Sequence, residues 1–243
     1  GKSSLCNALF QGEVTPVSDV HAGTREVQRF RLSGHGHSMV ITDLPGVGES
    51  RDRDAEYEAL YRDILPKLDL VLWLIKADDR ALSVDEYFWR HILHRGHQRV
   101  LFVVTQADKT EPCHEWDMAG IKPSPAQAQN IREKTEALFR LFRPVHPVVA
   151  VSARTGWELD TLVSALMTAL PDHAASPLMT RLQDGLRTES VRSQAREQFT
   201  GAVDRIFDTA ESVCVASVVR TALRAVRDTV VSVARAVWNW IFF

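Results

Sequence analysis

The sequence has few cysteines and no long apolar run. Its 243 residues include three cysteines, far apart, which form no disulfide pattern and fit a reducing compartment. No uncharged apolar stretch reaches the roughly 18–20 residues that span a bilayer. No secretory signal is expected either, because a polar run follows Lys2. These absences make the cytoplasm the expected location.

The sequence also lacks a strong net charge. The 29 Lys and Arg residues nearly balance 31 Asp and Glu residues, giving a net charge of -2, so no global basic field points to nucleic acid. Apolar residues make up 45% of the chain, which is enough for a packed core. The length suits one large domain, or one domain with an appendage.

The pattern that is present predicts an α/β fold. Near-continuous apolar runs at 69–75, 99–105 and 146–152 are typical of parallel strands covered on both faces. The alternating run 25–32 predicts an edge strand, and 38–43 predicts a second strand that ends on Asp43. Helices are expected between these runs, and strand–helix alternation is the signature of the class. The predicted helices cover 3–10, part of 49–63, 84–95, 125–142 and 157–170, with a long loop at 110–124.

The segment Pro171–Pro177, PDHAASP, predicts a domain boundary. Residues 178–243 contain no proline and are expected to be helical, so we predict a domain at 1–171 and a helical C-terminal region at 178–243. Within 212–243, valines form one helical stripe, the stretch ends in WNWIFF, and arginines cluster on the opposite side. This stretch suits either a half-buried helical hairpin or peripheral contact with the inner membrane. The clustered arginines are Arg220, Arg224, Arg227 and Arg235.

The chain opens with Gly1-Lys2-Ser3-Ser4, the end of a phosphate-binding loop, followed by a predicted helix. Backbone N–H groups at a helix N-terminus can point at a phosphate, and the helix dipole adds positive potential there. In such loops lysine contacts the β- and γ-phosphates, and the next hydroxyl binds Mg²⁺. Lys2 and Ser3 suit these roles, although the tripeptide alone also suits an ordinary helix start.

Three further residues suit the metal and the γ-phosphate. Asp43 begins the stretch DLPG at a strand end, where a carboxylate can hold a water of the metal. Gly46 ends that stretch, and its N–H can approach a γ-phosphate because no Cβ intervenes. Thr24, in the loop before strand 25–32, can reach Mg²⁺ when the loop closes. Each of the three alone would also suit an ordinary turn or loop.

Two polar stretches follow neighbouring predicted strands, at the edge where open parallel sheets bind ligands. TQAD (105–108) ends the strand 99–105, and the strand 146–152 ends at Ser152. A buried carboxylate can accept two hydrogen bonds from guanine N1–H and the exocyclic amine, a donor pair that adenine lacks. A small residue after Ser152 leaves its N–H free for guanine O6. The residues expected at the base are Thr105, Gln106, Asp108, Ser152 and Ala153.

In order and spacing, these stretches resemble the Era-like, translation-factor class of bacterial GTPases. The resemblance covers residues 1–170, and VSDVHAGTREVQRF and TQADK bring it closest to a prophage-encoded group within that class. It implies the Ras-like P-loop fold, with GTP or GDP and Mg²⁺. By this resemblance the phosphates are bound by Gly1, Lys2, Ser3 and Ser4, and the metal by Ser3, Thr24 and Asp43. The resemblance also implies that Lys2, Thr24 and Gly46 serve catalysis, and that Asp108 and Ala153 read guanine.

Three residues depart from patterns of related GTPases, and the first is Thr105, which stands in place of the Asn of the usual Asn-Lys-x-Asp. Gln106 replaces the lysine of the usual Asn-Lys-x-Asp, whose stem packs over the base, which predicts lower affinity with specificity retained. Val47 follows Gly46, where Ras-type proteins carry the glutamine that orients the attacking water. Era-like enzymes share this apolar residue. Another group must therefore place the water, such as Glu49, a backbone group, a cation or a partner, and we expect slow turnover.

The family's loop pattern is Gly-x-x-x-x-Gly-Lys-Ser, and the chain as given holds its last three residues. The first five would contribute about two or three amide donors, each worth roughly 1.5–3 kcal/mol when charge-assisted. We therefore expect impaired nucleotide binding by these 243 residues. A fragment of a longer GTPase and a truncated gene product are both compatible with this start.

Two functions of different classes remain open from the sequence. The first is a Mg²⁺-dependent GTP-binding protein that acts as a slow GTPase switch, with an unknown protein or ribosomal partner. Residues 178–243 contain no evident RNA-binding module. The second is a non-hydrolysing remnant, or an interaction protein that acts through amphipathic C-terminal helices at a membrane surface or on a partner.

Overall fold

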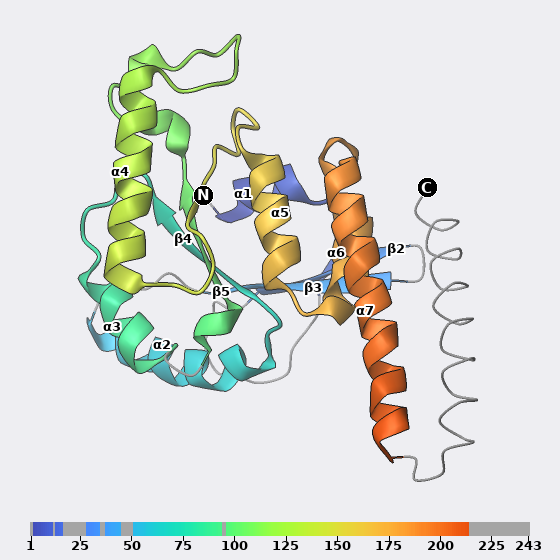
Figure 1. Cartoon of the computed structure of the whole chain (residues 1–243). Coiled ribbons are helices and arrows are strands. Elements are labelled where there is room, and N and C mark those ends of the chain that lie inside the picture. The colour runs from blue at the N-terminus through green and yellow to red at the C-terminus, as the bar shows by residue number, and fades with distance from the viewer. Residues whose placement is uncertain are drawn as a thin grey trace.

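The computed structural model describes residues 2–11, 13–16, 28–34, 37–44, 51–93 and 96–213 (Figure 1). They form the mixed α/β fold that the sequence predicts. Five short 3₁₀ turns connect its helices and strands. These turns are η1 Leu65–Lys67, η2 His97–Arg99, η3 Ala107–Lys109, η4 Cys113–Glu115 and η5 Asp184–Leu186.

A parallel sheet in the order β4-β5-β6 forms the centre of the molecule. Its strands are β4 Val71–Lys76, β5 Val100–Thr105 and β6 Val149–Ala150. All six residues of β5 are buried, because alternate side chains enter separate cores on the two faces of the sheet. The three near-continuous apolar runs are thus confirmed as covered parallel strands.

A second sheet is antiparallel, in the order β1-β2-β3. It consists of β1 Glu13–Pro16, β2 Gln28–Gly34 and β3 His37–Asp43. The prediction that 25–32 is an edge strand is wrong, because β2 pairs with β1 on one side and β3 on the other. In the described part of the chain, β3 and β4 belong to different sheets.

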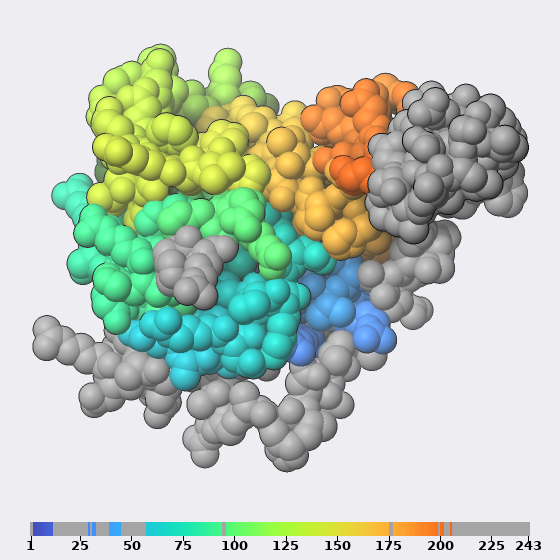
Figure 2. All heavy atoms as spheres, turned by 60° about the horizontal axis from the view of Figure 1, so that its bottom comes forward, coloured from blue at the N-terminus to red at the C-terminus, as the bar shows by residue number. Residues whose placement is uncertain are grey.

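Three helices cover one face of the parallel sheet. They are α2 Arg51–Ile64, α3 Ser83–His91 and α4 Pro125–Phe142. Aromatic side chains dominate this core: the rings of Tyr61 and Phe88 lie 5.3 Å apart, edge to face. Figure 2 shows the described surface of α2 (cyan) beside α3 (green) on one side of the molecule.

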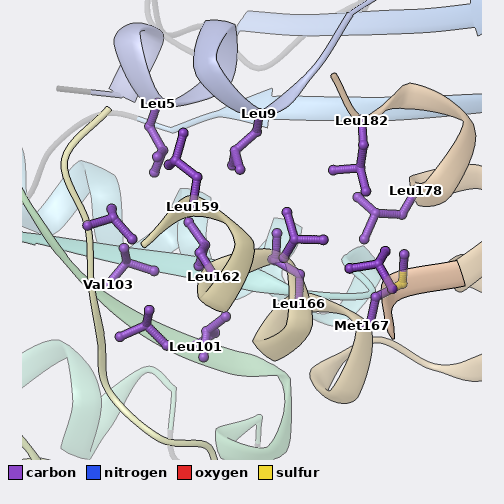
Figure 3. Packing of buried hydrophobic residues seen from close by; sticks show 14 of the residues in the cluster. Leu5, Leu9, Leu101, Val103, Leu159, Leu162, Leu166, Met167, Leu178 and Leu182 are labelled. Carbon is purple, nitrogen blue, oxygen red and sulfur yellow. The ribbon is translucent and has the colours of Figure 1, made fainter. Parts of the chain in front are cut away.

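Helices α1 Lys2–Leu9 and α5 Leu159–Ala169 lie over the other face. Leu5 and Leu9 are one helical turn apart in α1, so both point into the same core. Figure 3 shows them facing Leu159 and Leu162 of α5. The predicted helix at the start of the chain is therefore confirmed, with its apolar face buried.

The chain continues into α6 Asp172–Arg181 and α7 Glu189–Val213. The segment predicted as a domain boundary is therefore mostly helical, with Pro177 inside α6. Leu178 and Leu182 enter the same core as α1 and α5, as Figure 3 shows. The division into domains at 1–171 and 178–243 stays a prediction, but described residues from both sides of it share one core.

None of the helices in the described ranges is both long enough and apolar enough to cross a membrane. Residues 214–243 lie outside those ranges. They contain nearly all of the stretch 212–243 for which peripheral membrane contact was considered, so that possibility stays a prediction.

Candidate functional site

The predicted phosphate end begins at the first turn of α1. Lys2 Nζ donates a hydrogen bond to the Leu44 carbonyl, at 3.1 Å, and lies 3.4 Å from Asp43 Oδ1. Ser3 and Ser4 are exposed beside Lys2. The fold thus brings the proposed phosphate-binding lysine and the proposed metal-site carboxylate together, although the two residues are far apart in the chain.

The Asp43 carboxylate also influences groups on two helices. It helps to raise the pKa of the Cys6 thiol in α1, where burial is the larger cause. In α2 it contributes to the raised pKa of Tyr61, again after burial. Asp43 therefore projects negative potential between α1 and α2. An oxygen set of Ser3 and Asp43 suits Mg²⁺, which prefers hydroxyl, carboxylate and water oxygens.

The predicted base-binding end starts where β5 stops. The Thr105 hydroxyl donates to the Ile75 carbonyl at 3.4 Å, which links the end of β5 to β4. Gln106 then takes a left-handed backbone conformation, with φ of 59°, and the chain enters η3. This turn places Asp108 in the interior, where it is only 3% exposed.

Asp108 meets the second polar stretch, as the sequence predicts. The Ser152 hydroxyl donates to Asp108 Oδ1 at 2.6 Å, and both residues are buried. The backbone agrees, since Ala107 N–H donates to the Val151 carbonyl at 3.1 Å. Ala153 follows Ser152 and packs at the border of the core. Thr105, Gln106, Asp108, Ser152 and Ala153 are thus close together at one edge of the sheet.

The sequence reasoning missed Arg154. Its Nε donates to Asp108 Oδ2 at 2.8 Å, so the carboxylate has a charged partner as well as a hydroxyl. The arginine side chain is 63% exposed, whereas that of Asp108 is 2% exposed. The sequence does place Arg154 directly after Ser152-Ala153, which is a signal that it belongs to the base site. Only the fold shows that the carboxylate it contacts is that of Asp108.

A tight turn and two tryptophans support this edge. Ser152 N–H donates to the Trp157 carbonyl at 3.1 Å, and Gly156 N–H donates to the Ser152 carbonyl at 2.9 Å. Gly156 has φ of 80°, a conformation that a side chain would strain. Trp157 then packs edge to face on Trp116, with ring centroids 5.7 Å apart, next to Ala107. The turn residues are therefore held against the loop that carries Asp108.

Several predicted site residues lie outside the described ranges. They are Gly1, Thr24 and Gly46, together with Val47 and Glu49, which bear on the attacking water. Their predicted roles stay predictions. Within the described ranges no group of three or more His, Cys, Asp or Glu side chains could hold a metal ion. This does not test the predicted magnesium site, because its other ligands would be hydroxyls, water and phosphate.

Comparison with known families and proteins agrees with the fold of this chain. The model of the family described as 50S ribosome-binding GTPase matches residues 1–106. YeeP of Escherichia coli K12 is 94% identical over 183 residues, covering 75% of this chain and 78% of YeeP. YfjP of the same strain is 52% identical over 244 residues, covering 100% of this chain and 84% of YfjP. Both relatives are described as uncharacterized.

More distant relatives have described nucleotide ligands or solved structures. The probable GTP-binding protein EngB of Gemmatimonas aurantiaca is 32% identical over 181 residues, covering 71% of this chain and 79% of EngB. The structure of Era with MgGDPNP and a segment of 16S ribosomal RNA superposes with a TM-score of 0.51 at 21% identity, which supports the fold. That match covers 70% of this chain, which spans about half (53%) of the Era chain.

Proposed function

The chain belongs to the Era/EngB-like family of bacterial GTPases, and from this membership we propose that it binds GTP and GDP with Mg²⁺ and hydrolyses GTP slowly. The observation that carries the proposal is the buried carboxylate of Asp108 at the carboxyl end of β5. A ribosomal particle is the first macromolecular partner to test, because the family description names the 50S ribosome.

Guanine recognition follows from the position of that carboxylate. Asp108 lies shortly after the end of β5. The hydroxyl of Ser152, which lies shortly after β6, donates to Asp108 Oδ1 and orients the carboxylate. An ionised carboxylate accepts hydrogen bonds only, and guanine offers the N1–H and amine donors together. Adenine presents an acceptor at N1, so it meets the carboxylate unfavourably. The site therefore favours guanine over adenine, and Ala153 N–H is proposed to meet guanine O6.

Phosphate and metal binding follow from the first turn of α1. Lys2 is proposed to exchange its contact with Leu44 and Asp43 for the β- and γ-phosphates. Ser3, Thr24 and Asp43 are proposed to hold Mg²⁺ directly or through water, and Gly46 to contact the γ-phosphate. The metal supplies charge neutralisation during phosphoryl transfer. Because Val47 cannot orient water, hydrolysis is proposed to be slow.

Titration of the chain with GTP, GDP and ATP in Mg²⁺, followed by ligand-detected NMR, tests this function. Asp108→Ala should weaken GTP binding by about a hundredfold or more, because two charge-assisted hydrogen bonds of roughly 1.5–3 kcal/mol each are lost. Asp63→Ala is the matched control, because that aspartate is exposed in α2 and pairs with Lys67.

Phosphate release from GTP completes the test, with Lys2→Ala as the variant expected to lose it. Equal affinities for GTP and ATP would contradict guanine recognition. GTP binding that is unchanged by Asp108→Ala would exclude the proposed site. GTP binding without phosphate release would mean that the protein binds GTP but does not hydrolyse it, which contradicts the hydrolase part of the proposal.

A further inference from the structure

We propose that Arg154 is a positioning residue for guanine recognition, because it holds the Asp108 carboxylate from its exposed side. This inference rests on the proposed function, since Asp108 must be the group that reads the base. Arg154 lies outside the site that the sequence predicts. If it positions Asp108, its replacement should change the preference for guanine over other bases, whereas the loss of a purely structural contact should not.

Two side chains hold the carboxylate from different sides. Ser152 donates to Oδ1 at 2.6 Å, and Arg154 donates through Nε to Oδ2 at 2.8 Å. A carboxylate has two oxygens with about four acceptor positions, so two positions stay open for the two guanine donors. Asp108 is therefore oriented by two side chains before the base is bound.

The arginine also offsets the electrostatic cost of this burial. The Asp108 side chain is only 2% exposed, and a buried carboxylate without a charged partner is strongly disfavoured. The Ser152 hydroxyl is neutral, so it orients the carboxylate without neutralising its charge. Arg154 supplies the positive charge from the surface, where its side chain is 63% exposed. Its guanidinium therefore balances the negative charge that Asp108 places beside the base site.

The backbone of the turn makes Arg154 suitable for this task. Ser152 and Trp157 are hydrogen-bonded through their backbones, and Thr155 N–H donates to the Ser152 hydroxyl at 3.3 Å. Arg154 lies inside this closed turn, so its backbone is held in place near Asp108. Gln106 is neutral, so the TQAD stretch itself offers no cation at this position. The cation of the base site comes instead from the Ser152-Ala153 turn.

Paired titrations with GTP and ITP test this role, because ITP differs only in lacking the exocyclic amine. The wild-type chain should prefer GTP. Arg154→Ala should reduce this preference about fivefold, equivalent to about 1 kcal/mol, because a carboxylate held only through Oδ1 no longer presents both oxygens to the base. Arg154→Lys should restore most of the preference, since the ammonium can still pair with Oδ2.

Arg154→Gln keeps most of the side-chain volume without the charge and should also lose the preference for GTP over ITP. This variant tests the role of Arg154 even if the alanine variant does not fold. Arg140→Ala is the matched control, because Arg140 pairs with Glu136 on the exposed side of α4 and should leave the preference unchanged. Equal weakening of GTP and ITP, or an unchanged preference in Arg154→Gln, would overturn the role of Arg154 alone. A wild-type chain that binds neither nucleotide would overturn the proposed function together with this inference.

Discussion

At the residue scale, one departure from the family pattern beside the base site removes a charge. Gln106 occupies the position of the lysine that packs over the base in the usual Asn-Lys-x-Asp stretch. The backbone there is left-handed, with φ of 59°, which is uncommon for a residue with a Cβ. This conformation turns the chain from β5 into η3 and delivers Asp108 to the interior. Gln106 thus keeps the geometry of the turn but not the charge.

Restoring that charge should strengthen nucleotide binding. Gln106→Lys should tighten GTP binding about fivefold, because a cation over an aromatic ring is worth roughly 0.5–2 kcal/mol. The same NMR titration measures the change. Gln106→Met is the control, with similar length and no charge, and should gain less than the lysine variant. Equal gains in the two variants would assign the effect to packing instead of charge.

At the element scale, α4 connects the fold to the loop that follows Asp108. Pro125 begins the helix, and Ser124 and Gln127 form a capping box. The Ser124 hydroxyl accepts from Gln127 N–H at 3.2 Å, and Gln127 Oε1 accepts from Ser124 N–H at 3.1 Å. Gln127 is fully buried and also donates to the Thr110 carbonyl at 2.8 Å. One side chain therefore caps the helix and holds the loop.

Removing the cap should destabilise the protein by a predictable amount. Ser124→Ala should lower the free energy of unfolding by about 1 kcal/mol, because the Gln127 N–H loses its side-chain acceptor. Urea denaturation followed by circular dichroism measures this. Ser83→Ala at the exposed start of α3 is the control, since no side-chain cap is present there, and should change stability by less than about 0.5 kcal/mol. Equal losses in both variants would argue against the cap.

At the scale of the whole molecule, the end of α1 and the segment after α6 are joined although they are far apart in the sequence. The segment after α6 pairs with the end of α1: Gln183 N–H donates to the Leu9 carbonyl and Gln11 N–H to the Arg181 carbonyl, both at 2.8 Å. Leu182 is fully buried between these bonds, in the core shared by α1, β5, α5, α6 and α7. Gln198 of α7 also donates to the Met167 carbonyl of α5. The helices α6 and α7 therefore stabilise the core from which α1 presents Lys2.

A core substitution distinguishes one cooperative unit from two. Leu182→Ala should lower the free energy of unfolding by about 2–5 kcal/mol, because it removes a fully buried side chain. Unfolding should remain a single transition by both circular dichroism and tryptophan fluorescence. Leu141→Ala, at a partly exposed position in α4, is the control and should cost less. Two separate transitions, with only one shifted by Leu182→Ala, would favour independent domains at 1–171 and 178–243.

By itself the sequence determined the features that depend on local chemistry. Apolar runs predicted β4, β5 and β6, and the alternation of strands with helices predicted a helix at 125–142, the range observed for α4. The rule that ligands bind beyond the carboxyl ends of parallel strands predicted Asp108 and Ser152 at one edge of the sheet. These predictions succeeded because apolar runs and strand ends are signals between near neighbours in the chain.

Only the tertiary structure decided contacts between distant residues. Arg154 meets Asp108 across 46 residues, and no local pattern names the partner of an exposed arginine. The predicted domain boundary became part of α6 because Leu178 and Met179 of that helix enter a core formed with α1, and their burial outweighs the cost of Pro177 in a helix. Likewise β2 became a central strand because β1 adds to it. Long-range packing and charge pairing decided each of these outcomes.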